Sequence, residues 1–170
     1  MPRVVLIGPP GAGKSSVGRA IARILDCDVL DTDIEIEKRA GKKISEIFTD
    51  DGEASFRALE KIAVLDALET ATGVLALGGG SVLDIDVADS LRKSKIPVAY
   101  LQVSISQAAP RVGFNKERPL LTINPRQQWM ALMEVRKPIY EGLATMQVST
   151  DNRKPAEVAQ EIVDKLASVL

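Results

Sequence analysis

The segment Gly8–Ser15 constrains the fold more than any other part of the sequence. It reads Gly-Pro-Pro-Gly-Ala-Gly-Lys-Ser, which fits the pattern G-x-x-x-x-G-K-[ST] of a phosphate-binding loop. A β-branched run, Val4–Ile7, comes directly before it, and a helical pattern, Lys14–Leu25, overlaps its end. A strand, a glycine-rich turn and a helix in this order are the context in which the pattern binds phosphate. The alternative is a plain glycine-rich turn capped by Ser15.

Short β-branched runs alternate with longer helical patterns along the rest of the chain, which is typical of repeated βα units. We therefore predict a three-layer α/β/α fold around a five-stranded parallel sheet. The remaining strands are expected at Val29–Asp31, Val74–Leu77, Val98–Val103 and Met146–Val148. The remaining helices are expected at Asp33–Ala40, Glu53–Leu68, Val87–Arg92, Ser106–Arg111, Arg126–Glu141 and Pro155–Val169.

Residues 1–170 are expected to form one domain, because no repeat and no Pro/Gly/Ser linker divides the chain. The least regular stretch is residues 112–124, where glycine, asparagine and proline gather between two expected helices. Long loops in compact domains are often lids, so we predict that this segment is a mobile lid.

The composition excludes several kinds of chemistry. Histidine is absent and Cys27 is the only cysteine, which rules out a Ser-His-Asp triad, an intramolecular disulfide and a cysteine-built zinc site. The net charge of -1 gives no reason to expect nucleic acid or a membrane as a partner. The N-terminal apolar run Val4–Ile7 is too short for a signal peptide or a membrane span, and a reducing cytoplasm is the expected location.

The phosphate loop predicts a nucleotide site with a metal ion. Backbone N–H groups of such a loop turn inward around phosphate oxygens, and the positive end of the next helix faces the same anion. Lys14 is expected to reach the β- and γ-phosphates, and the Ser15 hydroxyl is expected to bind Mg²⁺.

Two carboxylates follow the second expected strand. In an extended chain Asp31 and Asp33 point the same way, and the carboxyl ends of parallel strands are where ligands bind in such sheets. We therefore place both residues beside the phosphate loop. The alternative is that one of them simply caps the next helix.

Three further features could contribute to a second ligand site. Arg57 shares a helix face with Glu53 and Glu60, which indicates either an exposed ion-pair ladder or an arginine held in place by two carboxylates. Three glycines, Gly78–Gly80, follow the third strand, which indicates either a close approach to a ligand or a flexible turn. Arg136 extends an apolar helical stripe that contains Trp129, so it either faces inward and needs an anion or snorkels to water.

Taken together, these motifs resemble the shikimate kinase family over essentially the whole chain. The matching segments are GPPGAGKSS at residues 8–16, LDTD at 30–33, Asp51-Gly52-Glu53 followed by Phe56-Arg57 and Glu60, LGGGS at 77–81, RPLL at 118–121, and Arg136 followed by Tyr140. Ser16 stands where many relatives carry threonine, and residues 113–117 match no strict pattern.

The resemblance implies a P-loop kinase fold of the nucleoside monophosphate kinase type and a defined reaction. The family transfers the γ-phosphoryl group of ATP to the 3-hydroxyl of shikimate, a step in chorismate and aromatic amino acid biosynthesis. A monomeric cytoplasmic enzyme that uses ATP and Mg²⁺ is therefore expected.

By the same resemblance, each motif residue has an expected role. Catalysis is expected to involve Lys14, Asp33 and Arg118, the last of these as the arginine of the lid. The nucleotide is expected to contact Gly11, Ala12, Gly13, Lys14, Ser15, Ser16, Arg111, Arg118, Arg153 and Pro155, with Arg111, Arg153 and Pro155 around the adenine. Shikimate is expected to contact Asp33, Phe48, Phe56, Arg57, Glu60, Gly78, Gly79, Gly80 and Arg136. Ser15 and Asp31 are expected to form the protein part of the Mg²⁺ site.

Two other functions stay open from the sequence. One is a different P-loop metabolite kinase, of the gluconate or nucleoside monophosphate type, although a pair of arginines suited to a carboxylate disfavours a nucleotide acceptor. The other is a nucleotide-binding regulatory protein without catalysis, which the retention of Lys14, Ser15, Asp33 and Arg118 disfavours.

Overall fold

A computed structural model describes residues 1–112 and 124–169 of the chain. A single five-stranded sheet with every pair parallel runs through the molecule in the order β2-β3-β1-β4-β5. Its strands are β1 (Val4–Ile7), β2 (Val29–Asp31), β3 (Val74–Ala76), β4 (Val98–Gln102) and β5 (Met146–Ser149). The predicted α/β fold with five parallel strands is confirmed.

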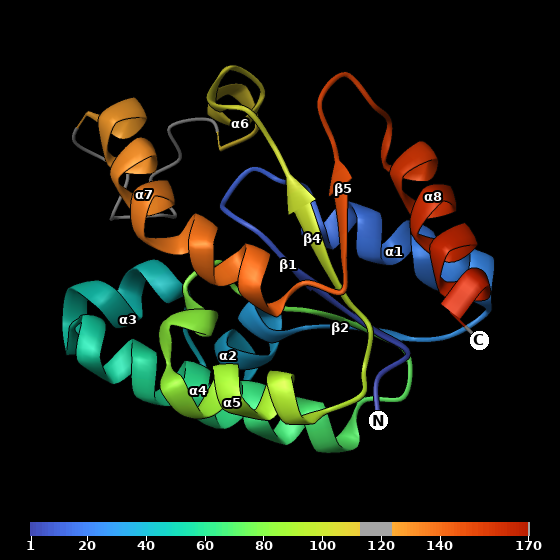
Figure 1. The fold of residues 1–170 in the computed structure, drawn as a ribbon. Coiled ribbons are helices and arrows are strands. Elements are labelled where there is room, and N and C mark those ends of the chain that lie inside the picture. The colour runs from blue at the N-terminus through green and yellow to red at the C-terminus, as the bar shows by residue number, and fades with distance from the viewer. Residues whose placement is uncertain (113–123, 170) are drawn as a thin grey trace.

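Helices cover both faces of the sheet (Figure 1). Their bounds are α1 (Lys14–Leu25), α2 (Thr32–Ala40), α3 (Ile44–Asp51), α4 (Glu53–Thr70), α5 (Ile85–Lys93), α6 (Ile105–Val112), α7 (Pro125–Leu143) and α8 (Pro155–Val169), with a 3₁₀ turn η1 (Ser81–Leu83). Helices α1 and α8 lie on one face, and α4, α5 and α7 lie on the other (Figure 1). No helix among the described residues is long and apolar enough to cross a membrane.

The central strand β1 shows why this layered packing forms. All four of its residues are buried. Successive side chains of a strand point to opposite faces, so Val5 and Ile7 join the apolar cluster under α4, α5 and α7, whereas Val4 and Leu6 join the cluster under α1 and α8. The uninterrupted apolar run that precedes the phosphate loop is therefore needed to fill two cores at once.

Parallel pairing places the carboxyl ends of all five strands at one edge of the sheet. The phosphate loop, Gly8–Ser15, follows β1 at this edge, and the α2 helix and the glycine loop, which we define as Gly78–Gly80, follow β2 and β3. These segments lie far apart in the sequence, and the register of β1, β2 and β3 brings them together.

The structure corrects several expected boundaries. Helix α3 was not predicted, and α2 begins at Thr32, so Asp33 lies in a helix rather than in an extended chain. Strand β4 ends at Gln102 instead of Val103. Val112 is the last residue of α6, and residues 113–123 of the expected lid lie outside the described residues.

Candidate active site

A cleft of about 610 Å³ lies at the carboxyl ends of β1, β2 and β3. It is bounded by the phosphate loop, the start of α2, parts of α3 and α4, the glycine loop and α7. The residues predicted from the sequence that line it are Gly11, Gly13, Lys14, Ser15, Ser16, Asp31, Asp33, Phe48, Phe56, Arg57, Glu60, Gly78, Gly79, Gly80, Arg111 and Arg136. The two groups of candidate residues, one for phosphate and one for a second ligand, therefore share one cavity.

The phosphate loop leaves the start of α1 open to an anion. Gly13 precedes the helix with φ of 85°, a left-handed conformation that favours glycine, and no described side chain caps the helix there. The uncapped first N–H groups and the helix dipole favour negative charge at this end. Lys14 Nζ donates to the carbonyl oxygens of Gly8 and Pro9, at 2.7 and 3.1 Å, which holds its positive charge over the loop.

Ser15 does not cap α1, which removes the interpretation of the loop as a plain capped turn. Its hydroxyl instead donates to Asp31 Oδ2, at 2.5 Å. The other oxygen of Asp31 accepts from the backbone N–H groups of Asp33 and Ile34, at 2.9 and 3.4 Å, and so caps α2. Asp31 thus combines both alternatives, because one oxygen caps a helix and the other faces the phosphate loop.

Asp33 lines the same cleft from the first turn of α2. A Cβ at Gly78 would lie 2.7 Å from Asp33 Oδ1 and 2.9 Å from Glu60 Oε2. Only a glycine fits between these carboxylates without displacing one of them. The glycine loop and the start of α2 are consequently in direct contact.

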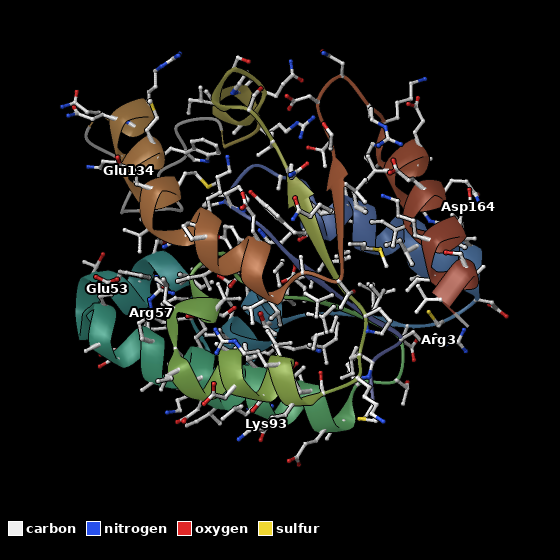
Figure 2. The ribbon with its side chains drawn as sticks, in the orientation of Figure 1. Arg3, Glu53, Arg57, Lys93, Glu134 and Asp164 are labelled. Atoms are coloured by element: carbon white, nitrogen blue, oxygen red, sulfur yellow. The ribbon has the colours of Figure 1, made fainter. Side chains whose placement is uncertain are left out.

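Arg57 is held by carboxylates on its own helix, α4. Its Nη1 lies 2.6 Å from Glu60 Oε1, and its Nε lies 3.7 Å from Glu53 Oε1. Figure 2 shows Glu53 at the outer side of α4 and Arg57 beside it, closer to α7. The Glu60 side chain is only 5% exposed, against 54% for Glu53. The ion pair of Arg57 with Glu60 is therefore not part of an exposed ladder. Burial raises the pKa of Glu60 despite the nearby Arg57 guanidinium.

Arg136 faces inward, as its apolar stripe predicts. The residue is only 4% exposed, and its Nε has no hydrogen-bond partner among the described residues. Its guanidinium lines the cleft, with Nη1 3.3 Å from the position that a Cβ at Gly79 would occupy. A charge this buried is costly unless an anion lies beside it, so the cleft favours a negatively charged ligand at Arg136.

The remaining predicted residues lie at or beyond the rim. Arg111 donates to the carbonyl of Gly11 at 3.3 Å and to Thr150, so it connects the phosphate loop with the segment after β5. Arg153 donates to Glu161, and neither it nor Pro155 lines the cleft. Ala12 is buried and does not line it either. Arg118 lies outside the described residues.

Two aromatic side chains form one wall of the cleft. The rings of Phe48, on α3, and Phe56, on α4, lie 4.9 Å apart between their centroids. The Arg57 guanidinium lies 5.2 Å from the centroid of the Phe56 ring. This arrangement gives the cleft an apolar side next to its charged groups, which suits a ligand with both a carboxylate and a carbon ring.

Sequence reasoning missed several contacts of the site. The Trp129 indole donates to the carbonyl of Pro10, at 2.9 Å, and Tyr140 donates to the carbonyl of Gly79. Thr32 accepts from the N–H of Gly78, at 3.1 Å. The helical spacing of Trp129 and Arg136 indicated a common face, but the partners of Trp129, Tyr140 and Thr32 depend on the tertiary fold.

Comparison with known proteins identifies the family. The family model described as shikimate kinase matches residues 10–167. The chain belongs to the shikimate kinase family. The shikimate kinase of Thermobifida fusca is 51% identical over 165 residues, which cover 97% of this chain and 95% of that relative.

Solved structures agree with the assignment to the shikimate kinase family. The shikimate kinase from Acinetobacter baumannii in complex with shikimate has a TM-score of 0.95 at 34% identity, over 99% of this chain and 94% of that one. A gluconokinase from Sinorhizobium meliloti has a TM-score of 0.58 at 23% identity, over 98% of this chain and 91% of that one. The similarity to the gluconokinase shows the fold alone.

Proposed function

We propose that this chain transfers the γ-phosphoryl group of ATP to the 3-hydroxyl of shikimate, giving ADP and shikimate 3-phosphate. The observation that carries the proposal is the single cleft in which the phosphate loop and two arginines suited to a carboxylate, Arg57 and Arg136, line the same cavity. The similarity to shikimate kinases over nearly the full length supports the same reaction. The reaction belongs to chorismate and aromatic amino acid biosynthesis.

The phosphate end of the cleft aligns and neutralises the transferring group. Phosphoryl transfer has a loose transition state, so catalysis depends mainly on positioning and on charge stabilisation. Lys14 is directed over the loop and would contact the β- and γ-phosphates, while backbone N–H groups at the start of α1 bind their oxygens. Arg118 is proposed to add positive charge, on the sequence alone.

The residues present fit a Mg²⁺ ion. The Ser15 hydroxyl and the Asp31 carboxylate are hard oxygen donors already in contact, and Mg²⁺ usually takes one or two protein oxygens together with phosphates and water. Among the described residues no group of three or more carboxylates, histidines or cysteines could hold a metal by itself. When bound, the ion would neutralise charge on the phosphates.

The acceptor end orients shikimate by its carboxylate. The planar guanidinium groups of Arg57 and Arg136 can each bind a carboxylate with two parallel bonds, which fixes the orientation of the ring. Glu60 keeps Arg57 in place from its buried side. The Phe48 and Phe56 rings would contact the apolar part of the ligand. This orientation determines which hydroxyl meets the γ-phosphorus.

Asp33 is the proposed group for the acceptor hydroxyl. Histidine is absent from the chain, so an aspartate is the reasonable group to orient that hydroxyl and accept its proton late in the transfer. Asp33 lines the cleft next to the glycine loop. The adenine would lie towards Arg111, with Arg153 and Pro155 beyond it.

An acceptor panel tests the proposed function. The purified chain with Mg·ATP is incubated with shikimate, gluconate and nucleoside monophosphates, and ADP release is measured for each. Shikimate should be the only effective acceptor. Preference for gluconate or a nucleotide would assign the chain a different acceptor, and equal slow ADP release with every compound would indicate a regulatory nucleotide-binding protein. We further propose that the enzyme is a cytoplasmic monomer that binds neither nucleic acid nor membranes.

A further inference from the structure

Two buried hydroxyl groups, one from α2 and one from α7, bind the glycine loop. Thr32 Oγ1, at the start of α2, accepts from the N–H of Gly78 at 3.1 Å and donates to the carbonyl of Ala76 at 3.4 Å. Tyr140 Oη, on α7, donates to the carbonyl of Gly79 at 2.5 Å. Both side chains are fully buried at 0% exposure. Neither is assigned a role by the reaction described above.

The glycine loop is in close contact with the charged groups of the acceptor site. A Cβ at Gly80 would lie 2.5 Å from Arg57 Nη1, and one at Gly79 would lie 3.3 Å from Arg136 Nη1. A Cβ at Gly78 would meet Asp33, as described above. Each of the three charged side chains that would bind the acceptor therefore rests against this loop, and a small shift of the loop would move all of them.

Three glycines in succession do not fix their own conformation, because glycine has the most freedom of any residue to lose. The loop therefore needs external contacts to stay in one conformation. The two hydroxyls supply such contacts, at the N–H of Gly78 and at the carbonyl of Gly79. Because the Tyr140 ring packs against Tyr100, with 5.2 Å between the ring centroids, its hydroxyl is in turn fixed by the core.

The Tyr140 hydroxyl keeps its proton across the physiological range. Burial raises its pKa to about 12, although the Arg136 guanidinium nearby acts in the opposite direction. The hydroxyl is thus always available as a donor to the Gly79 carbonyl. Loss of that donor would leave a buried carbonyl without its partner, which is more costly than the bond itself is favourable.

We infer that Tyr140 and Thr32 are positioning residues that preorganise the glycine loop, and through it Arg57, Arg136 and Asp33, for binding of the carboxylated acceptor. The inference rests on the proposed function. It predicts a selective effect: loss of either hydroxyl weakens acceptor binding, while nucleotide binding at the phosphate loop is unchanged. If the hydroxyls served folding alone, their loss would lower stability without weakening acceptor binding more than nucleotide binding.

The test uses Tyr140→Phe with Tyr100→Phe as the matched control. Tyr100 is also buried and its ring packs against that of Tyr140, and no hydrogen bond joins it to the loop among the described residues. In Tyr140→Phe the KM for shikimate should rise about 3- to 10-fold, with the KM for ATP changed by less than about twofold. Tyr100→Phe should leave both constants near those of the unaltered enzyme. Equal shikimate KM values in the two variants would overturn the inference.

Thr32 provides an independent test should Tyr140→Phe fail to fold. Thr32→Val removes the hydroxyl at nearly constant shape, whereas Thr32→Ser keeps it. The shikimate KM should rise in Thr32→Val and return to within about twofold of the original in Thr32→Ser. Similar KM values in both variants, with the melting temperature lowered in both, would leave only a structural role. Failure of the unaltered enzyme to phosphorylate shikimate would contradict the proposed function instead, so the two failures are distinguishable.

Discussion

The indole Nε1 of Trp129 donates a hydrogen bond to the carbonyl of Pro10, at 2.9 Å. The bond joins α7 to the phosphate loop across a wide separation in sequence. The same helix carries Arg136 and Tyr140, which contact the acceptor end of the cleft. One face of α7 therefore touches both ends of the site, and the only tryptophan of the chain lies at the phosphate end.

Trp129 emission should report nucleotide binding. Titration with Mg·ADP should change the emission saturably, because ligand at the phosphate loop alters the surroundings of the Pro10 carbonyl to which the indole is bound. Titration with shikimate should also change it, through Arg136 on the same helix face. The Lys14→Ala variant serves as the control, since it should lose most of the ADP response. Flat emission in both titrations would show that Trp129 is insulated from the site.

Arg136→Lys should weaken acceptor binding without loss of charge. A lysine cannot replace the two parallel bonds of a guanidinium with a carboxylate, so the KM for shikimate should rise about 10- to 150-fold. Arg126→Lys, an exposed change on the same helix, is the matched control and should have no such effect. A shikimate KM unchanged in Arg136→Lys would remove this arginine from the carboxylate site.

Lys14→Ala and Asp33→Asn should each lower kcat by at least about 10²-fold, which is typical of losing one positioned charge or proton acceptor. Glu35→Gln is the control for Asp33, because Glu35 lies in the same helix and pairs with Arg39 away from the reaction. Steady-state ADP release measures all three. A decrease of less than about threefold in Asp33→Asn would mean that this carboxylate has no part in proton transfer.

Glu60 should make stability depend on pH in a defined direction. Burial raises its pKa above the ordinary value of 4.5, so the folded state favours the protonated side chain. The stability contribution is complete below the ordinary pKa and is lost as the pH rises through the folded value. The melting temperature of the unaltered protein should therefore fall relative to that of Glu60→Gln as the pH rises above the ordinary pKa of 4.5. A relative rise would contradict the assigned direction.

The sheet and most helices could be predicted because their signals are local. The strand–loop–helix pattern at Gly8–Ser15 and the buried run Val4–Ile7 depend on residues close in sequence. Helix α3 was missed because it is short, although Ile44, Ile47 and Phe48 have helical spacing. Its start depends partly on Glu37, which accepts from the N–H of Ile44 at 3.0 Å across a turn, and no local pattern predicts that contact.

The sequence predicted which residues form the candidate site better than it predicted the contacts that these residues make. Charged residues on an apolar stripe or after a strand have few structural uses, so Arg136 and the pair of aspartates stood out. The chain was expected to be extended from Asp31 to Asp33, but α2 begins at Thr32, one residue before its expected start, and Asp31 caps it. The hydroxyls of Thr32 and Tyr140 could not be assigned, since their partners belong to the glycine loop after β3.

The proposed reaction is a direct transfer from ATP to shikimate within one cleft. It is tested by ADP release from the purified chain with Mg·ATP, measured with and without shikimate. Phosphorus NMR on the same mixture identifies the phosphorylated product. ADP release should need Mg²⁺, rise sharply with shikimate and be matched by an equal amount of shikimate 3-phosphate. Equal ADP release without shikimate, with free phosphate as the product, would contradict the proposed reaction.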